Sequence, residues 1–393
     1  MATFRRLVSV LALVAAPLLA TAASYFPPAG EWARVAPEKA GLDPAKLQQA
    51  VAFSVAHEST QPKDMALDLK QTFGARESRW KLLGPTQPRG GMTGIVIRHG
   101  YVVAAWGEPD RVDMTHSVSK TFLSTLVGLA FDRGMIRHLS DPAQDYVPGT
   151  DLFAAAHNRS ITWEHLLRQT SDWSGTLWDI PDWADRPIGT TEAEQENRPM
   201  HAPGSFFKYN DVRVNLLALV ALHVWRRPLP EVLRDEIMNP IGASASWHWE
   251  GYDNSWVELD GRRMQSVSGG GHFGGGMFIN AWDMARFGYL FLRHGRWDDR
   301  QLISEKWIAL ARTPGPANAE YGFCNWFLNP DRKAWPAAPA TAVIFEGNGA
   351  NIIYLDWDHD LLVVVRWIEG KAINDFLADV LGAITDQPAT VGP

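Results

Sequence analysis

Segments that favour β-strands lie towards both ends of this chain, and a long interval separates them. Residues 93–106 form two Val- and Ile-rich runs around a short turn, which predicts a β-hairpin. Residues 342–345, 351–356 and 361–367 are similar runs near the other end. Because strands must pair to satisfy their backbone groups, we expect the early and late runs to share one antiparallel sheet.

Stretches with helical spacing of apolar residues lie between these strand regions and outside them. The predicted helices of the interval are residues 121–133, 162–168, 212–225, 229–238 and 281–294. Further helices are predicted at residues 41–57 and 372–384. This order of elements predicts an α+β fold, in which an antiparallel sheet carries terminal helices and a helical lobe is inserted between its early and late strands.

The same order gives the boundaries of two predicted lobes. Residues 23–116 and 321–393 would form the sheet lobe, and residues 117–320 the inserted helical lobe. A cleft is expected where the lobes meet, since ligand sites favour such junctions. The glycine-rich run at 269–276 is too short for a linker and predicts a tight functional loop.

Residues 1–22 have the pattern of an export signal. Arg5 and Arg6 precede an apolar run, and small residues at 20–22 would form a cleavage site. The run is shorter than the ~20 apolar residues that span a bilayer, which predicts cleavage and no stable membrane anchor. We therefore expect a periplasmic or secreted protein, exported either by the general secretory (Sec) route or by the twin-arginine route.

Composition excludes several other classes of function. The formal net charge is -7 and no Lys/Arg block occurs beyond the N-terminus, which argues against nucleic acid as a partner. The histidines lack the paired spacing of a zinc hydrolase, and no Gly-x-Ser-x-Gly elbow of an α/β-hydrolase is present. We expect no metal and no cofactor; the sequence does not indicate an oligomeric state.

One short pattern suggests a nucleophile, because residues i and i+3 share a helical face and a lysine there can reach a serine hydroxyl. The pattern Ser-x-x-Lys occurs at Ser78 to Lys81, Ser117 to Lys120, and Ser205 to Lys208. A lysine acts as a base only where desolvation or a nearby positive charge lowers its pKa. The surroundings of each copy must therefore choose between them.

Only the copy at Ser117 opens an apolar helix, which would bury Lys120 and place a helix N-terminus beside the serine. Ser78 lies in a charged, irregular stretch where its lysine would stay solvated. Ser205 follows a Pro-Gly turn and leads into an extended segment, whose i and i+3 residues face opposite ways. Ser117 could otherwise be only a helix cap.

The run Ser117-Val118-Ser119-Lys120-Thr121-Phe122 resembles the first motif of the β-lactamase-related serine hydrolases. This group includes class C β-lactamases, penicillin-binding proteins, esterases and 6-aminohexanoate-dimer hydrolases. The resemblance continues through residues 161–171 and 277–292. It implies a β-lactamase/transpeptidase-like fold, with Ser117 as nucleophile and Lys120 as its base.

The second motif of the group, Tyr-x-Asn after a Pro-Gly turn, matches Tyr209-Asn210-Asp211. The resemblance makes Tyr209 a catalytic residue that relays the proton between lysine, serine and leaving group. Asp211 stands where penicillin-handling members commonly have an asparagine that bonds the acylamide. A carboxylate accepts such bonds but cannot donate them, so this substitution argues against β-lactam turnover.

The third motif, typically Lys-Thr-Gly or His-x-Gly on a strand, is represented by Gly347-Asn348-Gly349. The resemblance implies that Gly347 and Gly349 line the substrate site. It also implies an oxyanion hole made by the backbone N–H groups of Ser117 and Asn348. Neither lysine nor histidine is present, so a cationic grip on a substrate carboxylate is lost.

Further residues are candidates for contact with substrate, namely Trp178, Asp179, Asp211 and His272. Aromatic and acidic side chains would favour an apolar or cationic ligand; plain loop packing is an equal alternative. We expect an exported hydrolase that forms an acyl-enzyme on Ser117 from a small ester or short amide. The alternatives are a D-alanyl-D-alanine carboxypeptidase or β-lactamase, and a binding protein of the same fold without turnover.

Overall fold

The computed structural model describes residues 24–386. The predicted export signal at residues 1–22 lies outside the described residues. A six-stranded antiparallel sheet has the order β11-β12-β13-β14-β1-β2. Its strands are β11 (Phe327–Leu328), β12 (Val343–Gly347), β13 (Asn351–Asp356), β14 (Leu361–Arg366), β1 (Thr93–Arg98) and β2 (Tyr101–Trp106).

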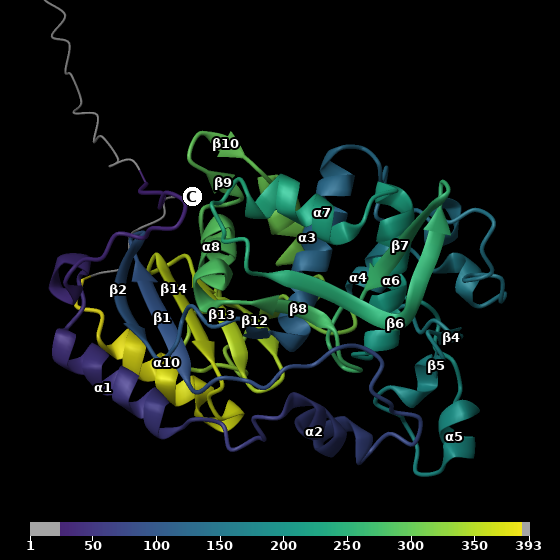
Figure 1. Cartoon of the computed structure of the whole chain (residues 1–393), viewed down its shortest axis with the longest axis horizontal. Coiled ribbons are helices and arrows are strands. Elements are labelled where there is room, and N and C mark those ends of the chain that lie inside the picture. Colours follow the sequence, from purple (N-terminus) through teal and green to yellow (C-terminus); the bar gives the residue numbers. More distant parts are fainter. Residues whose placement is uncertain (1–23, 387–393) are drawn as a thin grey trace, which may run out of the picture.

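The predicted union of early and late strands is confirmed, since β1 pairs with β14 along its whole length, from Thr93 opposite Arg366 to Arg98 opposite Leu361 (Figure 1). Side chains alternate between the two faces of the sheet, as strand geometry requires. Ile95 and Ile97 pack into one core, and Val96 packs into another. Both faces are therefore covered.

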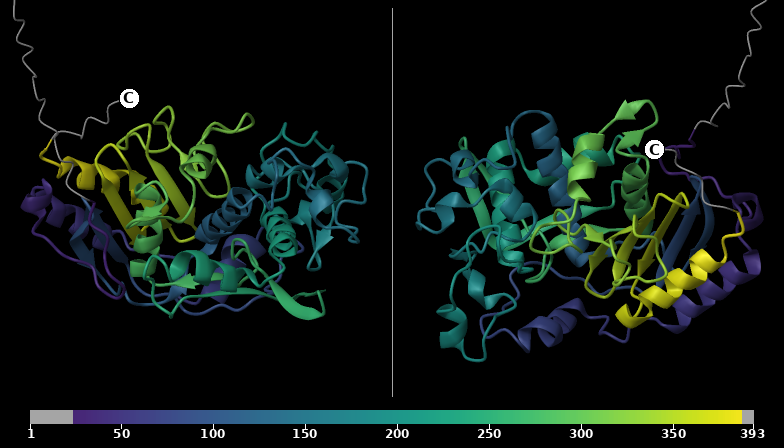
Figure 2. Two further views of the ribbon diagram at one scale, coloured as in Figure 1. Left: turned by 90° about the horizontal axis from the view of Figure 1, so that it is seen from above. Right: turned by 180° about the vertical axis from the view of Figure 1, so that it is seen from behind.

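Helices from distant parts of the chain cover these two faces. The terminal helices α1 (Pro44–Ala56) and α10 (Ile373–Gly382) pack together on one face (Figure 2). On the other face, α8 (Ala281–Leu292) packs against β13, β14 and β1. We expected the segment at 281–294 to belong to the inserted lobe; its apolar face packs on the large sheet instead.

The inserted part is helical around α6, and most of a second sheet that the sequence analysis did not predict also lies in it. The other helices are α2 (Met65–Leu69), α3 (Ser119–Asp132), α4 (Trp163–Leu167), α5 (Glu192–Glu196), α6 (Asp211–Trp225), α7 (Leu229–Leu233) and α9 (Glu305–Ala311). The second sheet has the order β3-β8-β6-β7, with β3 (Asp113–Met114), β8 (Gly276–Ile279), β6 (His248–Leu259) and β7 (Arg262–Val267). Two small hairpins join β4 (Thr176–Leu177) to β5 (Ile180–Pro181) and β9 (Arg296–Trp297) to β10 (Arg300–Gln301).

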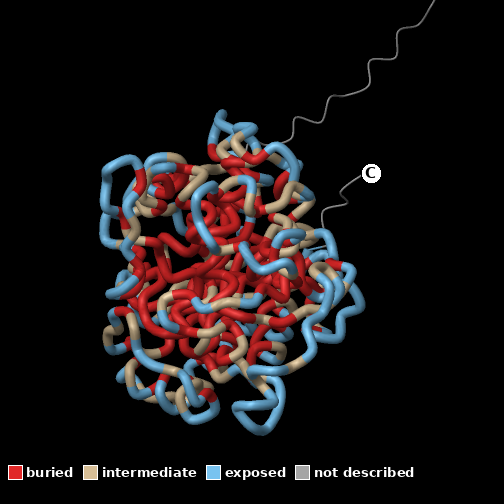
Figure 3. Tube along the Cα trace, turned by 90° about the vertical axis from the view of Figure 1, so that its right-hand side faces the viewer, coloured by how far each residue is buried: buried red, intermediate tan, exposed pale blue. Residues whose placement is uncertain are grey.

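The interior is continuous across both parts, and Figure 3 shows buried residues through the centre of the molecule. α6 is apolar on nearly all sides and buried along almost its entire length, as expected for a central helix. Within residues 24–386, none of the helices combines the length and apolarity needed to cross a bilayer.

Arg366 links the large sheet to the second sheet through a fully buried guanidinium. It donates to the Asn351 side chain at 2.8 Å, and to the carbonyl oxygens of Ile279 at 2.6 Å and Met114 at 2.8 Å. Burial lowers its pKa to about 10, because a guanidinium removed from water loses the solvation of its charge. These three bonds fix β3 and β8 beside β14, close to the start of α3.

We predict that Arg366→Met costs on the order of 3 kcal/mol of stability, because three buried acceptors lose their donor at once. Thermal unfolding followed by circular dichroism should show a fall in Tm of several degrees. Arg300→Met, at an exposed position on β10, is the matched control and should change Tm little. Equal Tm values for the two variants would contradict the role assigned to Arg366.

Candidate active site

Ser117 lies in a single 3-10 turn, His116–Val118, that leads directly into α3. Lys120 in the first turn of α3 places its Nζ 2.8 Å from Ser117 Oγ. His116 is buried with a φ of 48°, a strained conformation for a non-glycine residue. Such strain just before a nucleophile is common where a side chain must be held in one position.

The other two Ser-x-x-Lys copies do not form such a pair. Ser78 is exposed, and Lys81 forms a surface ion pair with Asp179 at 3.4 Å. Ser205 is also exposed, whereas Lys208 is buried, where desolvation lowers its pKa to about 8. Across the described residues, no hydrogen bond joins lysine to serine in either copy, in agreement with the choice of Ser117.

Asp211 is the principal partner of Lys120. Its Oδ1 lies 2.7 Å from Lys120 Nζ, and both side chains are fully buried. The other carboxylate oxygen, Oδ2, accepts a bond of 2.8 Å from Arg186. Asp211 therefore faces Lys120, the predicted base, and its side chain is not among those that line the cavity.

This arrangement sets the charge of the lysine. Burial acts to lower the pKa of Lys120, but the charge of Asp211, the neighbouring Tyr209 and the hydrogen bond to Asp211 together leave the pKa above its usual value. Burial likewise acts to raise the pKa of Asp211, but Lys120 and Arg186 hold that pKa below its usual value. The Asp211 carboxylate thus stabilises the charged form of Lys120, contrary to the lowered pKa expected from the sequence.

Glycine at position 270 makes room for this ion pair. A Cβ at Gly270 would lie 1.8 Å from Asp211 Oδ1 and 2.0 Å from Lys120 Nζ. The glycine-rich run at 269–276 therefore passes directly against the buried charges. A larger residue there would displace the carboxylate from the lysine.

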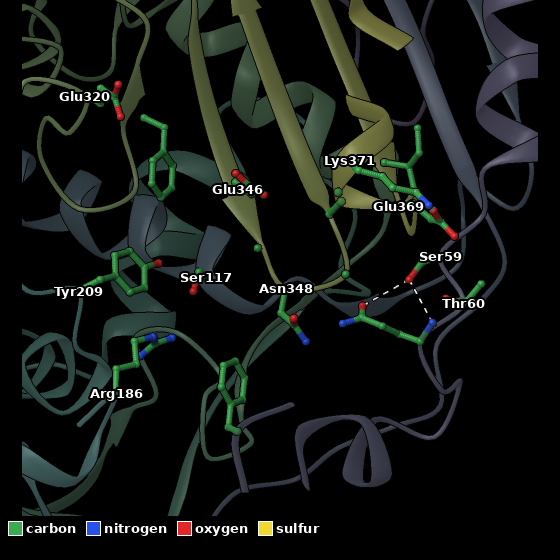
Figure 4. A pocket seen from close by; sticks show the side chains of 18 of the residues that line it. Ser59, Thr60, Ser117, Arg186, Tyr209, Glu320, Glu346, Asn348, Glu369 and Lys371 are labelled. Carbon is green, nitrogen blue, oxygen red and sulfur yellow. Dashed lines mark hydrogen bonds and ion pairs between the residues drawn. The ribbon is translucent and has the colours of Figure 1, made fainter. Parts of the chain in front are cut away.

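Tyr209 closes the pair from the other side. Its ring lies 4.7 Å from Lys120 Nζ and 4.9 Å from the Arg186 guanidinium carbon, both in cation–π range. Burial raises the pKa of Tyr209, and Lys120 opposes that rise, so the phenol keeps its proton. Figure 4 shows its hydroxyl directed towards Ser117.

The end of β12 approaches the nucleophile from the large sheet. A Cβ at Gly347 would lie 2.2 Å from the Thr115 carbonyl oxygen and 3.1 Å from the Ser117 nitrogen, so only glycine fits here. Asn348 follows directly, with its side chain bonded to Asp68 at 2.8 Å. Gly349, with a φ of 72°, turns the chain against Trp367. The backbone at 347–348 thus passes beside the Ser117 backbone.

A cavity of about 940 Å³ opens over Ser117 (Figure 4). Its lining combines predicted residues with others that the sequence did not single out, including Ser117, Tyr209, Gly347, Asn348, Gly349, Phe73, Arg186, Phe207, Glu320, Phe327, Glu346, Glu369 and Lys371. The predicted nucleophile, the predicted tyrosine and the residues of the third motif therefore line the same cavity. Lys120 and Asp211 lie beneath it.

Three predicted substrate contacts lie elsewhere. Trp178 and Asp179 form the turn of the β4–β5 hairpin, with φ values of 53° and 63°, and Asp179 points to solvent. His272 is buried behind Asp211, 3.9 Å from its Oδ2, and its Nε2 bonds Glu77 at 2.7 Å. None of these three side chains is among the residues that line the cavity over Ser117, so their contact with substrate stays a prediction.

Glu77, Asp185 and His272 form a compact group whose ligand atoms lie within 4.8 Å of one another. Such donors suit a divalent cation. Arg186 already places its guanidinium 2.6 Å from Asp185 and contacts Asp211 as well. Asp185 of this group therefore already has an arginine of the chain itself as its partner.

A sequence profile of the family described as β-lactamase matches residues 81–367, most of the described chain. The chain belongs to the β-lactamase family. A β-lactamase of Pseudomonas fluorescens is 28% identical over 129 residues, which cover 32% of this chain and 34% of that protein. The match thus spans about a third of the length of this curated relative.

Solved structures of β-lactamase-like proteins share the fold. A family VIII carboxylesterase superposes with a TM-score of 0.57 at 16% identity, over 86% of this chain and 96% of that one. EstCE1, a hydrolase with promiscuous acyltransferase activity, superposes with a TM-score of 0.55 at 16% identity, over 88% of this chain and 100% of that one. A penicillin-binding protein homologue from Caulobacter crescentus superposes with a TM-score of 0.55 at 16% identity, over 87% of this chain and 97% of that one. The β-lactamase family of serine hydrolases thus includes this chain, with esterases among its structural neighbours.

Sequence reasoning singled out none of the charged residues that line the cavity, which are Arg186, Glu320, Glu346, Glu369 and Lys371. Arg186 follows Asp185 in a polar loop, where an Asp-Arg pair is most often a solvated surface feature. Glu346 directly precedes the third motif. Its place on the same face of β12 as Ile344, two residues before it, was the only feature of the sequence that could have pointed to it. Neither residue belongs to a motif that predicts chemistry.

We predict that Asp211→Asn moves the rise of kcat/KM to lower pH. A base must lose its proton, and Asp211 raises the pKa of Lys120, so removing the carboxylate's charge lowers the pH at which the lysine becomes neutral. The profile is measured with a p-nitrophenyl ester from neutral to alkaline pH. Asp179→Asn, on the exposed hairpin turn, is the control and should not shift it. A shift to higher pH in Asp211→Asn would contradict this account.

Proposed function

We propose that this protein is an exported esterase or short-chain amidase that forms an acyl-enzyme on Ser117. The contact of 2.8 Å between Lys120 Nζ and Ser117 Oγ, at the floor of a cavity, is the single observation that carries the proposal. The other two Ser-x-x-Lys copies lack it. Membership of the β-lactamase family supports the same chemistry.

The proposed reaction follows from the neighbours of Ser117. The hydroxyl oxygen attacks the substrate carbonyl, and its proton passes to Lys120 once that lysine is neutral. Tyr209, whose ring lies against Lys120, relays the proton to the leaving group. Water then attacks the acyl-enzyme by the reverse proton route and releases the acid.

The oxyanion formed in each step needs two donors close to Ser117. We assign them to the backbone N–H groups of Ser117 and Asn348. The close approach of Gly347 to the Ser117 nitrogen supports this assignment, because it brings the β12 end to the right place. Backbone donors do not depend on the side chain that replaces the family's usual lysine or histidine.

The charges around the cavity favour esters without a carboxylate over β-lactams or peptides that carry one. Arg186 is bonded to Asp185 and Asp211, and Lys371 pairs with Glu369 at 2.9 Å. In the described chain, both cations lining the cavity therefore already have carboxylate partners. A substrate carboxylate would have to compete with them.

Export is part of the proposal and rests on the sequence of residues 1–22. The basic, apolar and small-residue segments there favour a cleavable signal and a periplasmic or secreted mature protein. A hydrolase that uses no metal or cofactor would act in that compartment on small esters or amides. Its oligomeric state is left open.

Replacement of the nucleophile tests the proposal directly. We predict that Ser117→Ala reduces hydrolysis of p-nitrophenyl butyrate by roughly a thousandfold or more. A fluorophosphonate should add one covalent mass to the wild type and none to this variant. Ser205→Ala, the control, should retain activity and labelling, since Ser205 is exposed outside the cavity lining. Equal activity in all three proteins would refute the assignment, and no activity in the wild type would favour a binding protein.

The preference for esters over β-lactams gives a second prediction. The wild type should hydrolyse nitrocefin with a kcat/KM at least about a hundredfold below that for p-nitrophenyl butyrate, because no free cation meets the β-lactam carboxylate. Absorbance assays of both substrates under one condition measure the ratio. Comparable values would favour the β-lactamase alternative.

A further inference from the structure

Glu346 is a carboxylate on the wall of the catalytic cavity without an internal partner. It directly precedes Gly347, whose backbone lies against Ser117, so it is held next to the nucleophile's turn (Figure 4). The side chain is half-buried. No hydrogen bond or ion pair from residues 24–386 reaches its carboxylate oxygens, and burial raises its pKa.

The contrast with other charges of the cavity is informative. Arg186 and Lys371 are each matched by carboxylates, as described above, and Glu369 is matched by Lys371. Glu320 also lines the cavity but is exposed, so water can solvate it. Glu346 alone combines partial burial with the absence of a countercharge among the described residues that line the cavity.

Aromatic rings line the same cavity as Glu346, among them those of Phe207 and Phe327. Phe327 lies opposite Ile344 on the neighbouring strand, two residues before Glu346 and on the same face of β12. An aromatic face attracts a cation and repels an anion. A carboxylate beside aromatic rings is a combination suited to an alkylammonium group.

We infer that the substrate carries a positively charged ammonium group, which binds between Glu346 and the aromatic wall while its ester or amide carbonyl lies at Ser117. This inference rests on the proposed function and specifies its substrate class. Glu346 is then a specificity-determining residue: it selects the cation and takes no part in proton transfer. A substrate with a carboxylate at the same place would meet a like charge.

Matched pairs of esters test the inference, because a quaternary nitrogen and a quaternary carbon have nearly the same shape. Choline butyrate is compared with neohexyl butyrate, in which carbon replaces the charged nitrogen of the alcohol. The p-nitrophenyl ester of γ-butyrobetaine is compared with its all-carbon isostere, which places the charge in the acyl group. The readout is the ratio of kcat/KM for the charged ester to that for the neutral ester.

The wild type should prefer the charged member of at least one pair by about tenfold or more. Glu346→Gln keeps the shape of the side chain and should reduce that ratio to within about threefold of unity. Glu320→Gln removes a charge from the same cavity and is the control; it should leave most of the preference. Turnover of the neutral ester shows that each variant is folded.

Three results would overturn the inference: no preference for charge in either pair, a preference that Glu346→Gln retains, or an equal loss of preference in Glu320→Gln and Glu346→Gln. All three leave the proposed function standing, provided that Ser117→Ala abolishes turnover of the neutral esters. If Ser117→Ala remains active, the proposed function itself fails. The two failures are thereby distinguished.

Discussion

Lys120 and Asp211 are buried charges, and each compensates much of the cost of burying the other, so removing either would leave a buried charge without its main partner. The pair joins the first turn of α3 to the first residue of α6, the two helices at the centre of the inserted part. Glycine at 270, the ring of Tyr209 and the guanidinium of Arg186 all take their positions around it. The position of Ser117 depends on the same pair, since Lys120 holds its hydroxyl.

Much of the fold could be predicted because its elements have regular periods. The strands at 93–106 and 342–367, the terminal helices and α6 follow simple patterns of apolar residues. The second sheet was missed because β6 has an irregular register between Gly251 and Trp256, and β8 is short and glycine-flanked. The spacing of apolar residues predicts a helix at α8, but it does not determine which sheet that helix packs against.

The site was predictable where a motif combined with a helix, as for Ser117 and Lys120, and less so where side-chain direction mattered. The motif gave the position of Asp211 but not the direction of its carboxylate, which points to the lysine. Trp178, Asp179 and His272 had suitable chemistry, yet none of them is among the residues that line the cavity. Arg186 was identified only from the structure, through its contacts with Asp185 and Asp211 and its place in the cavity lining.

The sheet that carries Gly347 is assembled from residues separated by most of the chain, with β1 paired to β14. The nucleophile and its lysine lie on the early side of that separation, and the strand end beside them lies on the late side. During synthesis, the serine and lysine therefore emerge long before the strand that completes their surroundings. A chain still being synthesised, with β14 not yet released, therefore lacks the sheet that holds Gly347 beside Ser117.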